Sequence, residues 1–156
     1  GLDEKFWQQS PFELSGGQKR RVAIAGVLAM HPEVLILDEP TAGLDPKGRD
    51  EILDEISALH RERHMTIILV SHSMEDIARY ADRIMVMNHG EKMFDAPPKE
   101  VFRHYKELEA IGLAAPQITY IVQGLKEHGV PIADDITTVA EARDAILQLL
   151  GKDKKS

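Results

Sequence analysis

Val34-Leu35-Ile36-Leu37-Asp38-Glu39 is the stretch that decides the predicted fold. Four apolar residues followed by two carboxylates are typical of a strand buried on both faces of a parallel sheet. A similar apolar run spans residues 66–70. Between the two runs, Asp45-Pro46 starts an amphipathic segment that extends to about residue 63, as in a helix with an acidic cap and a proline at its first position. The order strand, helix, strand predicts a βαβ unit.

A further helix is predicted before the first strand. Ser15 suits the N-cap position, and Gln18, three residues later, completes a capping box. Residues 20–30 are rich in Ala, Val and Leu, and His31-Pro32 ends the segment, because the residue before a proline is disfavoured in helical conformation. After the second strand we expect a short helix at residues 73–80, a hairpin from residues 83–88 and 91–94, and helices within residues 99–150.

The composition narrows the class of protein. The 156 residues carry a net charge of −7, and an acidic chain is a poor non-specific ligand for the phosphates of nucleic acid. The absence of cysteine excludes disulfides, thiolate chemistry and cysteine-based zinc sites. The longest apolar run, residues 22–30, is shorter than the roughly 20 residues of a membrane-spanning helix. We therefore expect one domain, or a piece of a larger one, that reaches a membrane only through partners.

Two groups of residues lie where ligands bind in α/β proteins. Gly16 and Gly17 leave the first backbone N–H groups of the predicted helix uncovered, so an anion can approach the positive end of its dipole. A well-capped helix without a ligand shows the same pattern. Asp38 and Glu39 follow a parallel strand at its carboxyl end, the usual place for ligands in such sheets, although acidic residues also end many strands of no function.

His72 directly follows the second strand, so it should open onto the same crevice as Asp38 and Glu39. A lone histidine is more often structural than catalytic. That structural interpretation is given to the other six: His31, His60, His64, His89, His104 and His128.

These segments together resemble the motifs of the ABC ATPase family. Leu14-Ser15-Gly16-Gly17-Gln18 resembles the signature motif, and Leu35-Ile36-Leu37-Asp38-Glu39-Pro40-Thr41 resembles Walker B. Ala42-Gly43-Leu44-Asp45-Pro46 resembles the D-loop, and Ser71-His72 the switch-histidine loop. The resemblance implies an α/β fold, namely part of a P-loop NTPase parallel sheet with flanking helices, followed by a C-terminal helical extension.

The resemblance also implies roles for single residues, with ATP and Mg²⁺ as cofactors. Asp38 would bind Mg²⁺ through water, and Glu39 would polarise the attacking water. His72 would contact the γ-phosphate, and Asp45 would lie at the dimer interface. Four residues would contact ATP held by the opposite subunit: Ser15, Gly16, Gly17 and Gln18.

Further stretches resemble the ATPase subunits of energy-coupling factor importers, which take up vitamins or transition-metal ions such as cobalt in prokaryotes. They are residues 10–14, 22–30, 73–76, 112–113 and 116–119. The resemblance implies that the partners are a second ATPase subunit and integral membrane subunits, and that nucleic acid is not a partner. It also implies a peripheral location at the cytoplasmic face of the cell membrane. We expect residues 1–94 to belong to the nucleotide-binding domain, residues 95–150 to form a helical extension that aids dimerisation, and residues 151–156 to form a disordered tail.

A P-loop, Gly-x-x-x-x-Gly-Lys-Ser/Thr, is not found in these 156 residues, since Gly151-Lys152 is the only Gly-Lys pair and Asp153 follows it. We therefore expect the C-terminal half of an ATPase subunit that alone neither binds ATP tightly nor hydrolyses it. A sheet edge left open beside the second strand should favour a swapped or dimeric state. The alternatives are a non-catalytic dimerisation fragment, or the ATPase of another ABC importer class. A soluble ABC protein of repair or translation is disfavoured by the short link from Gln18 to Asp38.

Overall fold

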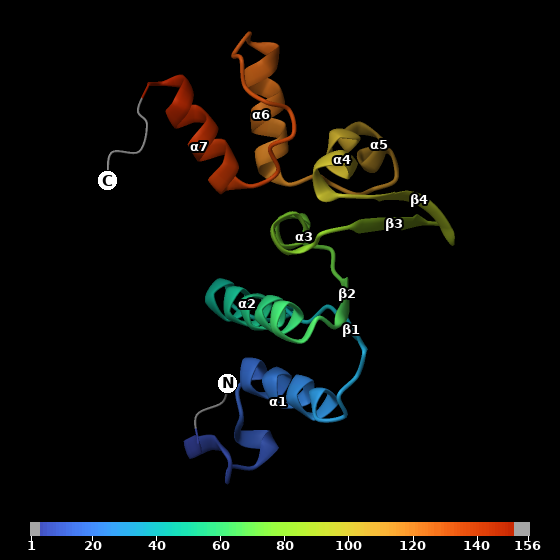
Figure 1. The fold of residues 1–156 in the computed structure, drawn as a ribbon, viewed down its shortest axis with the longest axis vertical. Helices are drawn as coiled ribbons and strands as arrows, with labels where there is room; N and C mark the ends of the chain where they lie inside the picture. Colours follow the sequence, from blue (N-terminus) through green and yellow to red (C-terminus); the bar gives the residue numbers. More distant parts are fainter. Residues whose placement is uncertain (1–3, 152–156) are drawn as a thin grey trace. The chain divides into compact units, whose positions relative to one another are not determined.

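The computed structural model describes residues 4–151, which form two compact units that divide between His72 and Ser73 (Figure 1). The predicted tail, except for Gly151, lies outside the described residues. The first unit contains the 3₁₀ turns Glu4–Phe6 and Pro11–Glu13, then α1 (Gly16–Leu28), β1 (Val34–Asp38), α2 (Pro46–Arg63) and β2 (Thr66–Val70). The second contains α3 (Met74–Tyr80), β3 (Ile84–Asn88), β4 (Glu91–Ala96), α4 (Pro98–Arg103), α5 (Tyr105–Ala110), α6 (Gln117–Glu127) and α7 (Val139–Leu149).

The first unit is built on the predicted βαβ motif. β1 and β2 pair in parallel, in a register that runs from Val34 opposite Thr66 to Asp38 opposite Val70. α2 connects them and begins as predicted, with Asp45 as its N-cap and Pro46 at its first position. The α/β fold class is therefore confirmed, and the carboxyl ends of the two strands meet at one edge of the sheet.

The prediction that both faces of these strands are buried is wrong for this chain. Leu35 and Leu37 are buried, as are Ile52, Leu53 and Ile56 of α2, which places the core of the unit on one side of the sheet. The alternate side chains are exposed, and Ile36 is the most open, at 64%. Side chains alternate across a strand, so one face needs a second layer, which the described residues do not supply. The exposed apolar face consists of Val34, Ile36, Ile68 and Val70.

Ion pairs attach α1 to α2. The helix buries none of its own residues, and its apolar side chains Val22 and Val27 are exposed. Arg21 contacts two carboxylates of α2, with its Nη2 at 2.6 Å from Glu51 Oε2 and its Nε at 3.5 Å from Glu55 Oε2. α1 ends at Leu28, two residues before the predicted end.

The second unit starts with α3 and the predicted hairpin. β3 and β4 are antiparallel, with a register shift between Val86 and Met87. The turn between them places His89 at φ 48° and Gly90 at φ 82°. Positive φ at both central residues is the geometry of tight hairpin turns, and it explains the glycine. Ile84 and Val86 are buried in one cluster with residues of α4 and α5, so the hairpin packs with the helices that follow it.

The helices of the second unit form two hydrophobic clusters. The first contains Ile84, Val86, Val101, Phe102, Leu108 and Ala115. The second joins α6, α7 and the loop between them through Val122, Ile132, Ile136 and Ala142. None of the helices within residues 4–151 is long and apolar enough to cross a membrane. The domain bounds predicted at residues 1–94 and 95–150 remain a prediction.

Charged side chains connect α4 with the segment that leads into α7. Lys99 Nζ lies 2.9 Å from Glu141 Oε1 and 3.6 Å from Asp135 Oδ2. One turn later, Arg103 lies 3.6 Å from Asp134, which also bonds Lys126 at 2.9 Å. Lys126 above all, with Arg103, lowers the pKa of Asp134. Exposed pairs contribute little individually, so this network chiefly fixes the orientation of the loop.

The buried leucine of α5 should determine the stability of the second unit. Leu108 is 1% exposed in the first cluster, whereas Leu150, after α7, is 63% exposed. We expect Leu108→Ala to lower the free energy of unfolding by about 2–5 kcal/mol through lost burial and a cavity. The matched change Leu150→Ala should alter it by less than about 0.5 kcal/mol. Urea titrations followed by circular dichroism measure both, and equal losses would contradict this description of the core.

The hairpin carries a carboxylate with a shifted pKa. Hydrogen bonds from Arg83 and then Lys92 lower the pKa of Asp95 to about 2. We expect Arg83→Gln to raise the pKa of Asp95 toward its usual value of about 3.9. Because the pKa of the folded state is depressed, the stability that the contact contributes is present above about pH 4 and is lost as the pH falls toward 2. Carboxyl ¹³C chemical shifts measure the pKa, and Arg79→Gln, on α3, should leave it unchanged.

Candidate functional site

The N-terminus of α1 forms the predicted capping box. Ser15 Oγ accepts a hydrogen bond from the Gln18 N–H at 3.3 Å, and Gln18 Oε1 accepts one from the Ser15 N–H at 2.8 Å. A Cβ built on Gly16 meets no atom within 4 Å, and one on Gly17 meets only the side chain of Leu44, at 3.7 Å. Packing within residues 4–151 therefore requires neither glycine. Together they keep the first turn open to an approaching group.

The first residue after β1 lies against the end of β2. Glu39 donates its backbone N–H to the carbonyl of Val70 at 2.9 Å, which continues the parallel ladder by one residue. Its φ is +45°, a conformation that is uncommon for a residue with a side chain. The carboxylate is partly shielded, with 33% of the side chain exposed. Glu39 is thus held at the carboxyl edge of the sheet by backbone geometry.

The structure brings Glu39 and His72 together. The Nδ1 atom of His72 lies 2.8 Å from Glu39 Oε1. The imidazole is otherwise open, with 85% of the side chain exposed. A histidine that uses one ring nitrogen for a carboxylate has its orientation fixed and presents its other nitrogen to a ligand. The carboxylate can orient a water, and an imidazole with a proton on each ring nitrogen can donate Nδ1–H to the carboxylate and Nε2–H to a phosphate oxygen.

Asp38 is the last residue of β1 and is exposed. Within residues 4–151, no three His, Cys, Asp or Glu side chains gather in a group that could hold a metal ion. A single exposed carboxylate fits Mg²⁺, which retains several waters and is completed in nucleotide enzymes by phosphate oxygens. The donor set is therefore compatible with Mg²⁺ bound together with a nucleotide, and does not form a protein cage for the metal ion.

Asp45 has a structural task in this chain. Its Oδ1 accepts a hydrogen bond from the Gly48 N–H at 3.3 Å and caps α2. A Cβ at Gly48 would lie 2.8 Å from that oxygen, so the cap explains the glycine. Asp45 is exposed, and the predicted place of this residue at a dimer interface stays a prediction.

The candidate residues form two separate groups. No hydrogen bond joins Ser15 or Gln18 to Asp38, Glu39 or His72 in the described part of the chain. That the two groups serve different nucleotides stays a prediction.

Sequence reasoning missed Arg20. Its Nη1 donates to the carbonyl of Glu39 at 3.1 Å, and its Nη2 to the carbonyl of Ala42 at 3.3 Å. No spacing rule identifies such a contact, because it joins a helix to a turn 19 residues later. The basic run at residues 19–21 was the only available signal.

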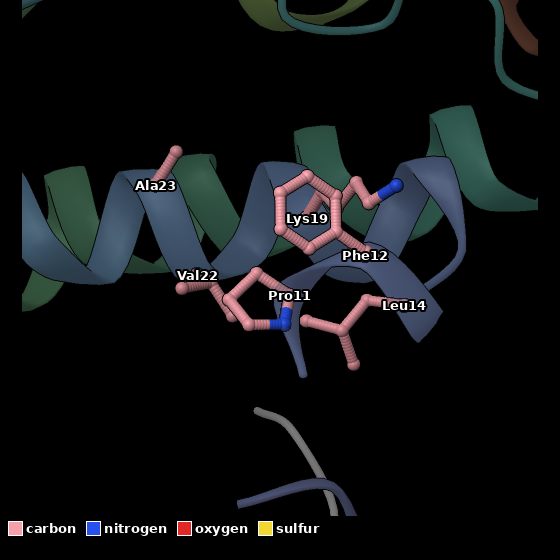
Figure 2. A pocket seen from close by; sticks show the side chains of 6 residues that line it. All are labelled: Pro11, Phe12, Leu14, Lys19, Val22 and Ala23. Carbon is pink, nitrogen blue, oxygen red and sulfur yellow. The ribbon is translucent and has the colours of Figure 1, made fainter. Parts of the chain in front are cut away.

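A shallow apolar hollow of about 410 Å³ lies beside the first turns of α1 (Figure 2). It contains none of the predicted site residues. Its walls are almost wholly carbon, and one lysine is the only charged residue, which makes it unsuitable for a triphosphate. The lining residues are Pro11, Phe12, Leu14, Lys19, Val22 and Ala23.

A helix with a bare N-terminus, a βαβ unit and a carboxylate–histidine pair at the strand ends define part of an ATP-binding cassette of the P-loop NTPase fold. The sequence model of the ABC transporter family matches residues 1–42. Energy-coupling factor transporter ATP-binding protein EcfA2 of Clostridium tetani is 62% identical over 150 residues, and that of Clostridium perfringens is 58% identical over 151. Each alignment covers 96% of this chain. The chain belongs to the ABC transporter ATP-binding family.

Solved structures agree with this assignment. CbiO1 of Clostridium perfringens, described as part of the ABC transporter complex cbiONQ, is 42% identical with a TM-score of 0.61 and covers 77% of this chain. A bacterial ABC transporter cassette solved as a dimer is 36% identical with a TM-score of 0.55 over 62% of this chain. The chain spans about half the length of the curated relatives it matches, 52% and 53% of the two EcfA2 proteins.

Gly16 can be tested for its structural role alone. We expect Gly16→Ala to raise the free energy of unfolding of this chain by about 0.4–1 kcal/mol, since the added methyl group meets open space and restricts the unfolded chain. Gly48→Ala is the matched control and should destabilise, because its Cβ collides with the Asp45 carboxylate. Urea titration measures both. A destabilised Gly16→Ala chain would show that the glycine is needed for folding and would remove the argument for an open helix end.

Proposed function

We propose that this chain is part of an ATP-hydrolysing subunit of an energy-coupling factor importer, which drives the uptake of a metal ion or a vitamin. The contact of 2.8 Å between Glu39 and His72, at the ends of two adjacent parallel strands, carries the proposal. The contact holds a carboxylate and an imidazole at the edge of the sheet where α/β proteins bind nucleotides, which supports their roles as proton acceptor and phosphate ligand. The identity of 62% to an energy-coupling factor ATP-binding protein supports the type of transporter.

In this mechanism Glu39 orients and polarises the water that attacks the γ-phosphate. General-base assistance of this kind is worth about 10²–10⁴ in rate. His72 keeps the carboxylate in place through Nδ1–H and, with both ring nitrogens protonated, donates Nε2–H to the phosphate, where negative charge develops during transfer. Asp38 would hold Mg²⁺ through water, and the metal ion would neutralise charge on the phosphates.

The bare end of α1 completes a site in a partner subunit. Gly16 and Gly17 provide backbone N–H groups at the positive end of a helix, a favourable place for phosphate, and they lie between Ser15 and Gln18, whose own N–H groups are used in the capping box. No P-loop occurs in these 156 residues, so this end of α1 would meet the ATP that an opposite subunit holds, with Asp45 at the same interface. The dimeric state of a similar cassette supports such pairing. Integral membrane subunits would anchor the pair at the cytoplasmic face.

A non-catalytic pairing fragment is the second candidate function. The exposed apolar face of Val34, Ile36, Ile68 and Val70 favours it, because such a surface on a sheet invites association. ATP binding distinguishes the two candidates. The 156-residue chain alone should bind ATP weakly and show no ATP turnover. The longer subunit that contains it should bind ATP tightly and hydrolyse it.

Glu39 is the residue whose change tests the proposal. In the longer subunit, within its transporter complex, we expect Glu39→Gln to lower ATP turnover by about 10²-fold or more while ATP still binds. The matched control is Glu33→Gln, just before the opposite end of β1, where the side chain is exposed and should not affect turnover. Phosphate release and binding of a fluorescent ATP analogue give the two measurements. Normal turnover in the Glu39→Gln complex would refute the assigned role.

A further inference from the structure

Arg20 bridges both ends of the turn that follows β1. Its guanidinium donates Nη1 to the carbonyl of Glu39 at 3.1 Å and Nη2 to the carbonyl of Ala42 at 3.3 Å. The Ala42 N–H also donates to the Glu39 carbonyl, at 3.1 Å, and closes the turn. Pro40 and Thr41, between them, are buried. A single side chain of α1 therefore holds a turn that is otherwise closed by one backbone bond.

The turn has a conformation that needs such support. Glu39 has φ +45°, and residues in sparsely populated backbone regions persist only where their surroundings over-determine them. Four bonds hold Glu39: its N–H donates to the Val70 carbonyl, its carbonyl accepts from both the Ala42 N–H and Arg20 Nη1, and its carboxylate contacts His72 Nδ1. Loss of Arg20 would leave the Glu39 carbonyl held by the Ala42 N–H alone, so the turn would be less constrained and the Glu39 carboxylate less precisely placed.

The two neighbouring cations do not share this role. The side chain of Lys19 is exposed and lines the apolar hollow, and Arg21 is directed to Glu51 and Glu55 of α2. Arginine is suited to the bridge, because its planar fork can donate to two acceptors at once, whereas the single ammonium of lysine is a compact point donor. Of the three adjacent basic residues at positions 19–21, the geometry therefore assigns the bridge to Arg20.

We propose that Arg20 is a positioning residue for Glu39, and that it joins the nucleotide-facing end of α1 to the water-polarising carboxylate of the same chain. Arg20 lies five residues after Ser15, little more than one turn along the helix. A displacement of α1 when its N-terminus meets phosphate is thereby passed to the turn 39–42. The inference rests on the proposed ATPase function of Glu39 and adds a group that does not itself contact the nucleotide.

The test is made in the longer subunit within its transporter complex, with ATP turnover measured against ATP concentration. We expect Arg20→Ala to lower kcat about tenfold or more, as a small displacement of a catalytic group does, with the KM for ATP changed less than about twofold. Arg20→Lys should give an intermediate kcat. Lys19→Ala removes a neighbouring positive charge and should leave both constants unchanged. A kcat of Arg20→Ala or Arg20→Lys within about twofold of the unmodified complex would overturn the proposal.

A double variant separates positioning from a general structural role. If Arg20 acts through the Glu39 carboxylate, Arg20→Ala should not lower further the residual turnover of the Glu39→Gln complex, measured as release of radiolabelled phosphate. An equal loss in both backgrounds would show that Arg20 merely supports the fold and would overturn the proposal. The single variant Glu39→Gln keeps the two proposals distinct. Full ATP turnover in the Glu39→Gln complex would refute the function of Glu39. Loss of turnover in that complex, together with normal turnover in the Arg20→Ala complex, would refute only the role of Arg20.

Discussion

The parallel pairing of β1 and β2 is the constraint on which the candidate site depends. Asp38 lies opposite Val70, and the Glu39 N–H extends the ladder with a bond to the Val70 carbonyl. The register alone therefore places the residue after one strand beside the residues after the other. Side chains alternate in direction with a period of two, so a slip of β1 by one residue would turn Leu35 and Leu37 out of the core and direct the Glu39 carboxylate away from His72. The hydrophobic pattern of two short strands thus sets the geometry of the carboxylate and the imidazole.

Much of this geometry could be predicted from the sequence, because it follows from local rules. The Ser15–Gln18 capping box, the Asp45 cap with Pro46, and the hairpin turn at His89-Gly90 each depend on a few adjacent residues, and the structure confirms all three. The placement of His72 next to Glu39 also followed, since consecutive parallel strands joined by one helix end at the same edge. Local capping and turn rules, together with the topology of the βαβ unit, were sufficient to predict these features.

The features that the sequence did not predict depend on contacts between residues that are distant in the sequence. Burial of both faces of β1 was wrong because an apolar run shows only that a strand prefers to be covered, and the described chain covers one face. Arg20 was missed because its partners are backbone carbonyls, which every residue possesses and no sequence pattern marks. Main-chain acceptors are common partners of side-chain donors. Motif reasoning therefore does not find contacts of this kind, even where they support a residue that is proposed to be catalytic.

In the proposed function, the arrangement would make ATP hydrolysis conditional on assembly. The Glu39–His72 pair is already formed in the isolated chain, whereas the bare N-terminus of α1 has a separate hydrogen-bond network and no bond to that pair. Suppose that one preformed pocket contained the water-polarising group, the phosphate-binding loop and the signature helix. Such a subunit would hydrolyse ATP without transport. In the proposed function these parts are distributed over two subunits, which would tie ATP turnover to the approach of the partner. Arg20 is the described connection within this chain between its two groups, and it acts on the backbone of Glu39, where a small displacement moves a carboxylate without removing it.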